Sequence, residues 1–274
     1  MRSAGDIVLS RVMDIPEQIA FEFPQGNDLL KRLQAIEFEM AVVIKDIFER
    51  NDIRYVIEYG SLLGAVRHGG FIPWDDDFDY VVFEDDYEKA SIALRKELPG
   101  KYILHDQVSD PNYFYSFAKV RHLHSVAIEE GFTDNLRYQG ISIDLFKGRI
   151  EKNNKYARRL FLARSHAKSH WRKFKMKKSA GECARCASYY SLACFYGILH
   201  SLTPKTDYFH KTPDTDQYFI PLERYMPFSK VSFNGVEFSA PRDPEYVLTD
   251  RYGDWRSIPK RITFHLQRLE IESD

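Results

Sequence analysis

Four aspartates stand inside an otherwise apolar, aromatic-rich stretch, and they restrict what the chain around them can form. The stretch reads YGSLLGAVRHGGFIPWDDDFDYVVF, and its acids are Asp75, Asp76, Asp77 and Asp79. The segment Phe78–Phe83 is rich in β-formers, which predicts a strand. Asp77 and Asp79 are two residues apart, so on a strand their side chains point to the same face. Asp75 and Asp76 are interpreted as loop residues that cap and face solvent.

Two carboxylates on one face of a strand predict a bound cation. Carboxylates held this close raise each other's pKa unless a cation lies between them. Oxygen ligands favour Mg²⁺ or Mn²⁺ over zinc, and Mg²⁺ is typically held by one or two carboxylates plus substrate phosphates. A third acid, Asp144, stands in the apolar segment ISIDLF. We expect Asp144 either to complete the metal site or to accept a proton from an attacking hydroxyl.

The Gly60-Ser61 pair precedes the acids at a predicted strand-to-helix turn. Glycine leaves room for a phosphate, and backbone N–H groups at the start of a helix bind phosphate oxygens. Ser61 is also expected to cap a helix over residues 62–67, which Gly69-Gly70 would end. Together with the acids, this turn indicates phosphoryl or nucleotidyl transfer.

Composition and charge narrow the class of protein. The chain has 274 residues, 44% of them hydrophobic and 29% charged, with a net charge of −1. This balance gives no reason to expect nucleic acid, whose non-specific binding needs a positive surface. No apolar run reaches the roughly 20 residues that span a bilayer, and the first residues lack the apolar core of a signal peptide. We therefore expect a cytoplasmic protein.

The order of predicted elements indicates an α/β (mixed α+β) fold with a mixed central sheet and a helical insertion. Apolar residues at alternating intervals of four and three predict a helix over residues 28–51. Asn234-Gly235 predicts a type I′ hairpin turn. Strands are expected at residues 54–58, 78–83, 113–120, 125–129 and 141–146, and helices at 85–98, 152–178 and 184–200. Three parts follow: a catalytic core with an amino-terminal helix at 1–150, a basic helical insertion at 151–227, and the rest of the core at 228–274.

Four segments resemble motifs of the LicD family of phosphotransferases, which includes bacterial phosphocholine transferases and is related to fukutin and fukutin-related protein. EYGSLLGAVRHGGFIPWDDDFD is similar to the diagnostic motif of that family. AKVRHLHS resembles its Lys-x-Arg strand, ISIDLF its third-aspartate strand, and RYGDWRSIP with His265 its carboxy-terminal motif. The chain departs from the family in Phe146-Lys147-Gly148, where a proline and a further acid are usual, and residues 152–228 align with no family motif.

The resemblance implies a nucleotidyltransferase-like fold and a CDP-activated donor. A phosphorylated alcohol, either phosphocholine or an alditol phosphate, would pass to a sugar hydroxyl of a surface glycan or its precursor, with release of CMP. Asp77, Asp79 and Asp144 would be the catalytic and metal-binding residues. The expected substrate-binding residues are Gly60, Ser61, Arg67, His68, Trp74, Lys119, Arg121 and His265. Two alternatives stay open: a non-catalytic glycan- or nucleotide-binding protein on the same fold, and a nucleotidyltransferase that makes the activated donor.

Three weaker patterns lie in the insertion. Lys155–Lys178 contains many cations and no acid, with aromatic residues between them, which suits either peripheral contact with an anionic membrane or a solvated helix. Cys183 and Cys186 have zinc-ligand spacing, but with only Cys194 and His200 nearby, idle thiols are the simpler interpretation. Tyr189, Tyr190, Phe195 and Tyr196 could form a cage for a quaternary ammonium group, although aromatic packing is the commoner explanation.

Overall fold

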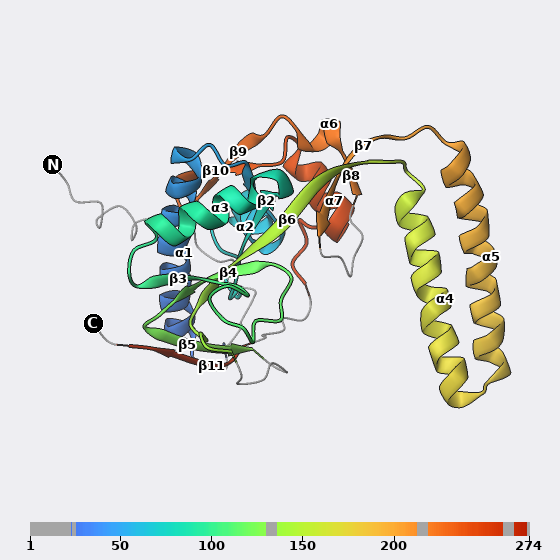
Figure 1. The fold of residues 1–274 in the computed structure, drawn as a ribbon, viewed down its shortest axis with the longest axis horizontal. Helices are drawn as coiled ribbons and strands as arrows, with labels where there is room; N and C mark the ends of the chain where they lie inside the picture. The colour runs from blue at the N-terminus through green and yellow to red at the C-terminus, as the bar shows by residue number, and fades with distance from the viewer. Residues whose placement is uncertain (1–22, 24–25, 130–135, 213–218, 260–265, 273–274) are drawn as a thin grey trace. The chain divides into compact units, whose positions relative to one another are not determined.

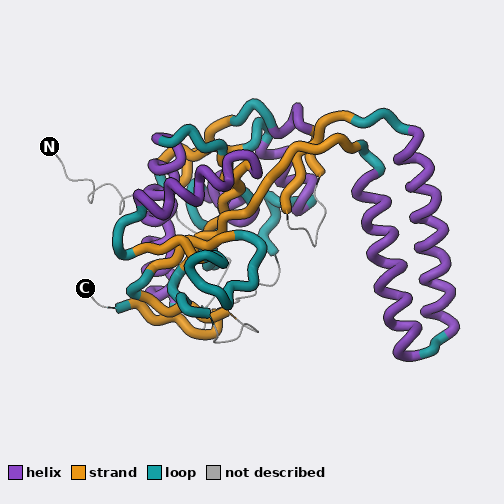
Figure 2. The backbone as a smooth tube through the Cα atoms, in the orientation of Figure 1, coloured by secondary structure: helices purple, strands orange, loops and turns teal. Residues whose placement is uncertain are grey.

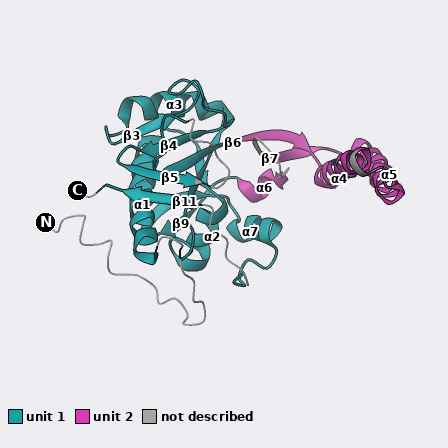
Figure 3. Cartoon of the chain, turned by 90° about the horizontal axis from the view of Figure 1, so that it is seen from below, with its two compact units in different colours: residues 1–147, 226–274 teal, residues 148–225 magenta. Residues whose placement is uncertain are grey.

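A computed structural model of the chain describes residue 23 and residues 26–129, 136–212, 219–259 and 266–272 (Figure 1). The chain divides into two compact units, which are coloured separately in Figure 3. The first unit combines residues 1–147 with residues 226–274, and the second is residues 148–225. Within the described ranges, no helix is both long and apolar enough to cross a bilayer.

The first unit contains both helices and strands, which confirms the predicted α/β class (Figure 2). Its helices are α1 (Asn27–Arg50), α2 (Tyr59–His68), α3 (Glu84–Glu97) and α7 (Pro244–Tyr252). Its strands are β1 (Tyr55–Ile57), β2 (Phe78–Phe83), β3 (Tyr102–His105), β4 (Ala118–His122), β5 (Ser125–Glu129), β9 (Ser229–Phe233), β10 (Val236–Ala240), β11 (Leu266–Ile271) and the first part of β6 (Ser142–Asn153).

The main sheet runs in the order β1-β2-β6-β4-β3. The pairs β1–β2, β3–β4 and β4–β6 are antiparallel. All six residues of β2 are buried, as its run of aromatic and β-branched side chains predicts. The strand that follows the acidic loop therefore lies inside the sheet, next to the strand that carries Asp144.

Helix α1 confirms the predicted helix. Of the apolar residues whose spacing predicts it, Leu33, Met40 and Ile47 are buried, whereas Leu29, Ile36 and Val43 are only partly buried. The buried positions include Leu30, Leu33, Glu37, Ala41 and Ile44, at intervals of three and four. The hydroxyl of Tyr80 on β2 donates to the carbonyl of Ala41 at 2.7 Å, so this face lies against the sheet. Glu37 therefore occupies a position on the helix that apolar side chains normally fill.

The predicted hairpin turn is confirmed, and its tip packs against the end of α2. Asn234 and Gly235, between β9 and β10, have φ values of 48° and 82°, as a type I′ turn requires. The backbone N–H of Asn234 donates to the carbonyl of Gly69 at 2.7 Å. A Cβ atom on Gly70 would collide with the side-chain oxygen of Asn234, and one on Gly64 would collide with the carbonyl of Gly70.

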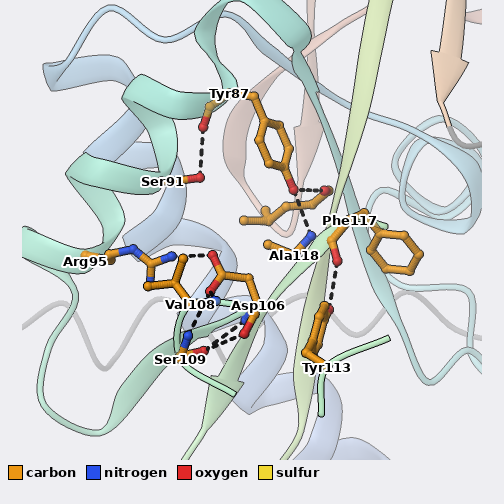
Figure 4. Close-up of polar contacts among 10 residues, drawn as sticks. Tyr87, Ser91, Arg95, Asp106, Val108, Ser109, Tyr113, Phe117 and Ala118 are labelled. Carbon is orange, nitrogen blue, oxygen red and sulfur yellow. Dashed lines mark hydrogen bonds and ion pairs between the residues drawn. The ribbon is translucent and has the colours of Figure 1, made fainter. Parts of the chain in front are cut away.

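The predicted strand over residues 113–120 is wrong in its first half. Strand β4 begins only at Ala118, and the aromatic residues before it form a loop that packs on itself. Figure 4 shows the hydroxyl of Tyr113 donating to the carbonyl of Phe117, at 2.8 Å. Aromatic residues favour strands because they suit a half-buried surface, and a folded-back loop offers the same burial.

Tyr87 on α3 connects three elements of the first unit (Figure 4). Its hydroxyl donates to the carbonyl of Leu145 on β6 and accepts from the backbone N–H of Ala118 on β4, both at 2.8 Å. The residues next to these two contacts are Asp144 and Lys119. Tyr87 thus fixes the strands at the place where their predicted functional side chains stand.

The second unit is built around two long helices that lie side by side in Figures 1 and 2. They are α4 (Ala157–Lys177) and α5 (Ala180–Leu202), and Lys178 turns the chain between them with φ 46°. Leu160, Ala163 and Ala193 form a small core between them. The unit also contains the end of β6, β7 (Thr206–Thr212), β8 (Phe219–Pro221) and α6 (Leu222–Tyr225).

Candidate functional site

The acidic loop lies directly against the first turn of α2. A Cβ atom on Gly60 would lie 2.5 Å from Oδ2 of Asp75 and 3.4 Å from Oδ1 of Asp77. Any larger residue would therefore push against the carboxylates, so glycine is needed for this close approach. The backbone N–H groups of the first turn of a helix have no partner within the helix and attract anions. Carboxylates and a potential phosphate-binding turn are thus neighbours.

Ser61 joins α2 to β2 and does not cap the helix, so the predicted cap is wrong. The helix begins at Tyr59, and its N-cap residue is Glu58. The Ser61 hydroxyl is buried and accepts the backbone N–H of Asp79 at 2.8 Å. This bond fixes the position of Asp79, which is itself buried, relative to the turn.

The aspartates lie in a field of like charge. Burial raises the pKa of Asp75 well above its ordinary value, and the charges of Asp77 and then Asp76 raise it further, while Arg67 lowers it. Asp77 is exposed, in contrast to Asp79. The loop therefore presents one accessible carboxylate, that of Asp77, beside Asp75, whose ionisation is costly without a nearby cation.

Glu37 is a further acid of this region, and the sequence reasoning missed it. The side chain is 1% exposed, and its Oε2 has no hydrogen-bond partner among the residues that the structure describes. Burial raises the pKa of Glu37 well above its ordinary value, followed by the charges of Asp77, Asp76, Asp75 and Asp79. The signal was available in the sequence, because Glu37 stands between Leu33 and Ala41 at the spacing of the apolar face.

We expect Glu37→Gln to stabilise the metal-free protein at pH 7. A buried acid whose pKa is raised takes up a proton on folding, so its contribution to stability falls as pH rises above the unfolded value of about 4.5. The neutral glutamine removes this cost, and the gain should vanish near pH 4, where the unfolded acid is protonated too. Melting curves at both pH values measure the effect.

Glu39→Gln is the matched control for Glu37→Gln, because Glu39 lies on the same helix, is exposed and forms an ion pair with Lys101 at 2.5 Å. Losing this surface pair should change the free energy of unfolding by less than about 1 kcal/mol. If Glu37→Gln raised the melting temperature as much at pH 4 as at pH 7, the destabilisation by Glu37 would not be linked to its protonation.

The predicted carboxy-terminal motif reaches the acidic loop. Burial raises the pKa of Tyr252 on α7, Arg251 lowers it, and Asp79 is the first of three aspartates that raise it further. The guanidinium of Arg251 lies 3.8 Å from the ring centre of Tyr59, which immediately precedes Gly60. Arg67 on α2 donates to the carbonyl of Trp255 at 2.8 Å. Residues about 190 positions apart in the sequence thus meet at both ends of α2.

Arg67, His68 and Trp74 lie together at the end of α2. The Nε of Arg67 donates to Nε2 of His68 at 2.9 Å, and the rings of His68 and Trp74 meet edge to face at 6.3 Å. Burial, followed by the charge of Arg67, lowers the pKa of His68 to about 4. The imidazole is therefore neutral near pH 7, and it can accept a hydrogen bond from Arg67.

The shifted pKa of His68 predicts a pH-dependent stability. Between pH 6.5 and 4 the unfolded chain binds a proton at His68 that the folded chain excludes. The neutral ring therefore contributes fully to the stability of the folded protein above pH 6.5, and this contribution is lost as pH falls towards 4. We expect His68→Asn to flatten the slope of melting temperature against pH in this window, and an unchanged slope would show that the ring is protonated in the folded state.

Lys119 and Asp144 form a buried ion pair that the sequence reasoning did not foresee. The two residues face each other on β4 and β6, with Nζ of Lys119 2.7 Å from Oδ1 of Asp144. The lysine side chain is 4% exposed and the aspartate 18%. Phe146 stands two residues after Asp144, on the same face of β6, and its ring contacts Tyr59 at 5.6 Å. Asp144 thus faces the side of the sheet where α2 begins.

Among the described residues, no contact brings Arg121, a predicted substrate-binding residue, to this place. Arg121 is 4% exposed, and its Nη1 donates to the carbonyl of Gly140 at 2.7 Å. This contact gives Arg121 a role in holding β4 to the segment before β6. His265 lies outside the described residues, and its contribution stays a prediction.

The donor set suits a hard cation, although the described residues contain no group of three His, Cys, Asp or Glu side chains already arranged around a metal position. The acidic loop suits Mg²⁺ or Mn²⁺ because its carboxylate oxygens lie close together. Burial and the neighbouring carboxylates raise the pKa of Asp75, and a bound cation would offset both effects. Asp144 faces Lys119 instead. The predicted set of Asp77, Asp79 and Asp144 therefore stays a prediction.

Comparison with known proteins places the motifs in a family. A family model described as LicD/FKTN/FKRP, nucleotidyltransferase domain, matches residues 52–180. The lipopolysaccharide cholinephosphotransferase LicD of Haemophilus influenzae is 51% identical over 41 residues, which are 15% of this chain and 16% of that protein. The human ribitol 5-phosphate transferase FKRP is 46% identical over 48 residues, 18% of this chain and 10% of that protein.

A protein of Rickettsia typhi is 41% identical over 64 residues, 23% of this chain and 21% of that protein. The alignments to these three relatives thus span between 10% and 21% of each relative's length. The matched region contains the turn at Gly60, the acidic loop, Lys119 and Asp144. The resemblance of the sequence motifs to the LicD family is confirmed, because residues 52–180 match the model of that family's nucleotidyltransferase domain.

Proposed function

We propose that the protein is a metal-dependent transferase that moves a phosphorylated alcohol from a CDP-activated donor to a sugar hydroxyl of a surface glycan or its precursor. The transferred group is phosphocholine or an alditol phosphate. The acceptor oxygen attacks the phosphorus that carries the alcohol, the bond from that phosphorus to the bridging oxygen breaks, and CMP leaves. The hydroxyl proton passes to a base of the protein.

The close contact between Gly60 and the carboxylates of Asp75 and Asp77 is the observation that carries this proposal. Diphosphates need both positive charge and N–H donors, and a helix start beside a carboxylate-bound cation supplies the two together. The names of the relatives LicD and FKRP, a cholinephosphotransferase and a ribitol 5-phosphate transferase, support the same class of reaction.

In this proposal Asp77 and Asp79 hold Mg²⁺ or Mn²⁺, which would neutralise charge on the phosphates when bound. The first turn of α2, at Gly60 and Ser61, binds the diphosphate. Arg67, His68, Trp74, Lys119 and His265 would supply further substrate contacts, whereas Arg121 is buried and bonded to the carbonyl of Gly140. These assignments follow the positions of the residues in the family motifs.

Asp144 is proposed as the proton acceptor. Its Oδ1 contacts Lys119, and a carboxylate has a second oxygen that can accept from a hydroxyl. The lysine keeps the carboxylate in one orientation and adds positive charge near the transferred phosphate. A sugar hydroxyl is a weak nucleophile until its proton is removed, so a base at this position would activate the acceptor.

One assay tests the proposal and its two alternatives. The protein is incubated with CDP-choline, CDP-ribitol or CDP-glycerol, a sugar acceptor and Mn²⁺, and CMP is measured. Release of CMP that depends on the acceptor supports the transferase. Incubation with CTP and the phosphorylated alcohol covers the donor-making alternative, which would release pyrophosphate. Binding of CDP-alcohols without turnover of any pair would favour a non-catalytic binding protein and overturn the proposal.

A further inference from the structure

Helix α5 exposes an apolar surface. From Cys186 to Leu202 the helix contains no Asp, Glu, Lys or Arg. Several of its large apolar side chains are nevertheless exposed: Tyr190 by 67%, Leu192 by 39%, Phe195 by 54%, Ile198 by 60% and Leu202 by 78%. Isolated exposed apolar residues are normal, but a continuous group of them on one element marks an interaction site.

The exposed residues lie on a different face from the one that packs on α4. The contact between the helices uses Ala193, with Tyr196 beside it, and Cys186, whose thiol donates to the carbonyl of Ala167 at 3.4 Å. Phe195, Ile198 and Leu202 follow one another at intervals of three and four, so they form one stripe along the helix. We call these three residues the outer face of α5.

Helix α4 supplies positive charge beside this apolar surface. Glu182 is the single acidic residue from Lys155 to Leu202. Among the side chains of α4 that the structure describes, seven cations are exposed: Arg158, Arg159, Arg164, Lys168, Arg172, Lys173 and Lys175. Packed helices lie roughly 8–10 Å apart, which is about one Debye length at physiological salt. Long basic side chains of α4 therefore stay within the electrostatic field of a surface that α5 touches.

We propose that the α4–α5 hairpin binds an anionic lipid surface, with the outer face of α5 among the acyl chains and the cations of α4 at the lipid phosphates. An interfacial helix needs an apolar face and nearby basic residues, and here two helices divide these tasks. Tyr190 and Trp171, which is 45% exposed, are of the residue types that settle at the headgroup level. The hairpin belongs to the second unit and the candidate site to the first, and the proposed lipid binding does not depend on the proposed reaction.

The charge of the hairpin favours lipid over the other candidate partners. A second copy of the chain, docked through α5, would bring two basic α4 helices into one assembly, with Glu182 as the only acid of each hairpin. That acid already contacts His170 at 2.6 Å and Arg185 at 2.9 Å. Nucleic acid would pair with the cations, but it would give the outer face of α5 no role.

Vesicle binding by the full chain tests the proposal. We expect sedimentation with vesicles of phosphatidylglycerol and phosphatidylcholine, and little with phosphatidylcholine alone. The triple variant Phe195→Gln, Ile198→Gln, Leu202→Gln should lower the partition coefficient by about 10³-fold, since each side chain loses its burial in lipid. Replacing Arg172, Lys173 and Lys175 by Glu should lower the partition coefficient by at least about 100-fold. Added salt should also lower it.

The matched control is Ile92→Gln with Val108→Gln, two side chains that are 61% and 79% exposed on the first unit. This variant should bind vesicles like wild type, and circular dichroism of all variants should show unchanged helix content. Size-exclusion chromatography with light scattering accompanies the assay. A dimer that the α5 variant dissociates, without vesicle binding by wild type, would overturn the proposal in favour of a second copy. Vesicle binding that ignores the α5 substitutions would overturn it as well.

Discussion

Asp77→Asn and Asp79→Asn are each expected to lower CMP release by about 10³-fold or more. A bound cation contributes several kcal/mol of stabilisation to the charge that develops on transferred phosphates, and about 4 kcal/mol corresponds to this factor. Neither substitution changes the backbone, so the bond from the N–H of Asp79 to the hydroxyl of Ser61 persists. The assay is the acceptor-dependent release of CMP at saturating Mn²⁺.

The same variants should be at least as stable as wild type without metal. Burial, and then the charge of Asp77, raise the pKa of Asp75 in the folded protein. A group with a raised pKa makes the folded protein less stable as pH rises above the pKa of that group in the unfolded chain. Removing the charge of Asp77 lessens that loss at pH 7. Mn²⁺ should raise the melting temperature of wild type and have little effect on the variants.

Asp46→Asn is the control for both substitutions, because Asp46 is a 51% exposed acid on α1 that contacts Lys45. It should keep both the activity and the Mn²⁺-induced rise in melting temperature. Variants of Asp77 or Asp79 that behave like this control would remove those residues from the metal site.

Asp144→Asn is expected to damage both turnover and stability. Loss of a proton acceptor typically lowers the rate by 10²–10⁴-fold. The substitution also leaves the buried ammonium of Lys119 without its carboxylate, and breaking a buried ion pair from one side costs about 3 kcal/mol or more. CMP release and denaturant unfolding measure the two effects separately.

The double variant Lys119→Met, Asp144→Asn separates the two roles of Asp144. Removing the lysine charge should restore most of the lost stability, because no buried ammonium has then lost its carboxylate. Turnover should stay low, since the proton acceptor is still missing. If excess Mn²⁺ alone restored the rate of Asp144→Asn, the residue would be a metal ligand and not the base.

Local sequence patterns correctly predicted the elements that residues close together in the sequence determine. The helix α1 follows from the spacing of its apolar residues, β2 from a run of aromatic and β-branched residues, and the β9–β10 turn from Asn234-Gly235. The loop at Tyr113–Phe117 was misinterpreted because aromatic residues pack equally well in a strand and in a loop that folds onto itself.

The candidate site was predictable only in part, because its contacts depend on strand register and helix rotation. That Lys119 faces Asp144 follows from the pairing of β4 with β6, which no local pattern specifies. Glu37 was missed because the spacing of the apolar residues alone does not show that the buried face of α1 includes position 37. Arg251 and Tyr252 could be placed near the acidic loop only through the family resemblance, since they are far from it in sequence.

The docking of Asn234 on Gly70 bears on what the long motif can reveal about substrate choice. Packing requires glycine at positions 64 and 70. A side chain on Gly64 would collide with the carbonyl of Gly70, and a side chain on Gly70 would collide with the side-chain amide of Asn234. Two of the motif's glycines are thus explained by the meeting of helix and hairpin, without any ligand. Similarity at these two glycines therefore reflects common architecture. If the proposed transfer takes place, neither position carries information on which alcohol is moved.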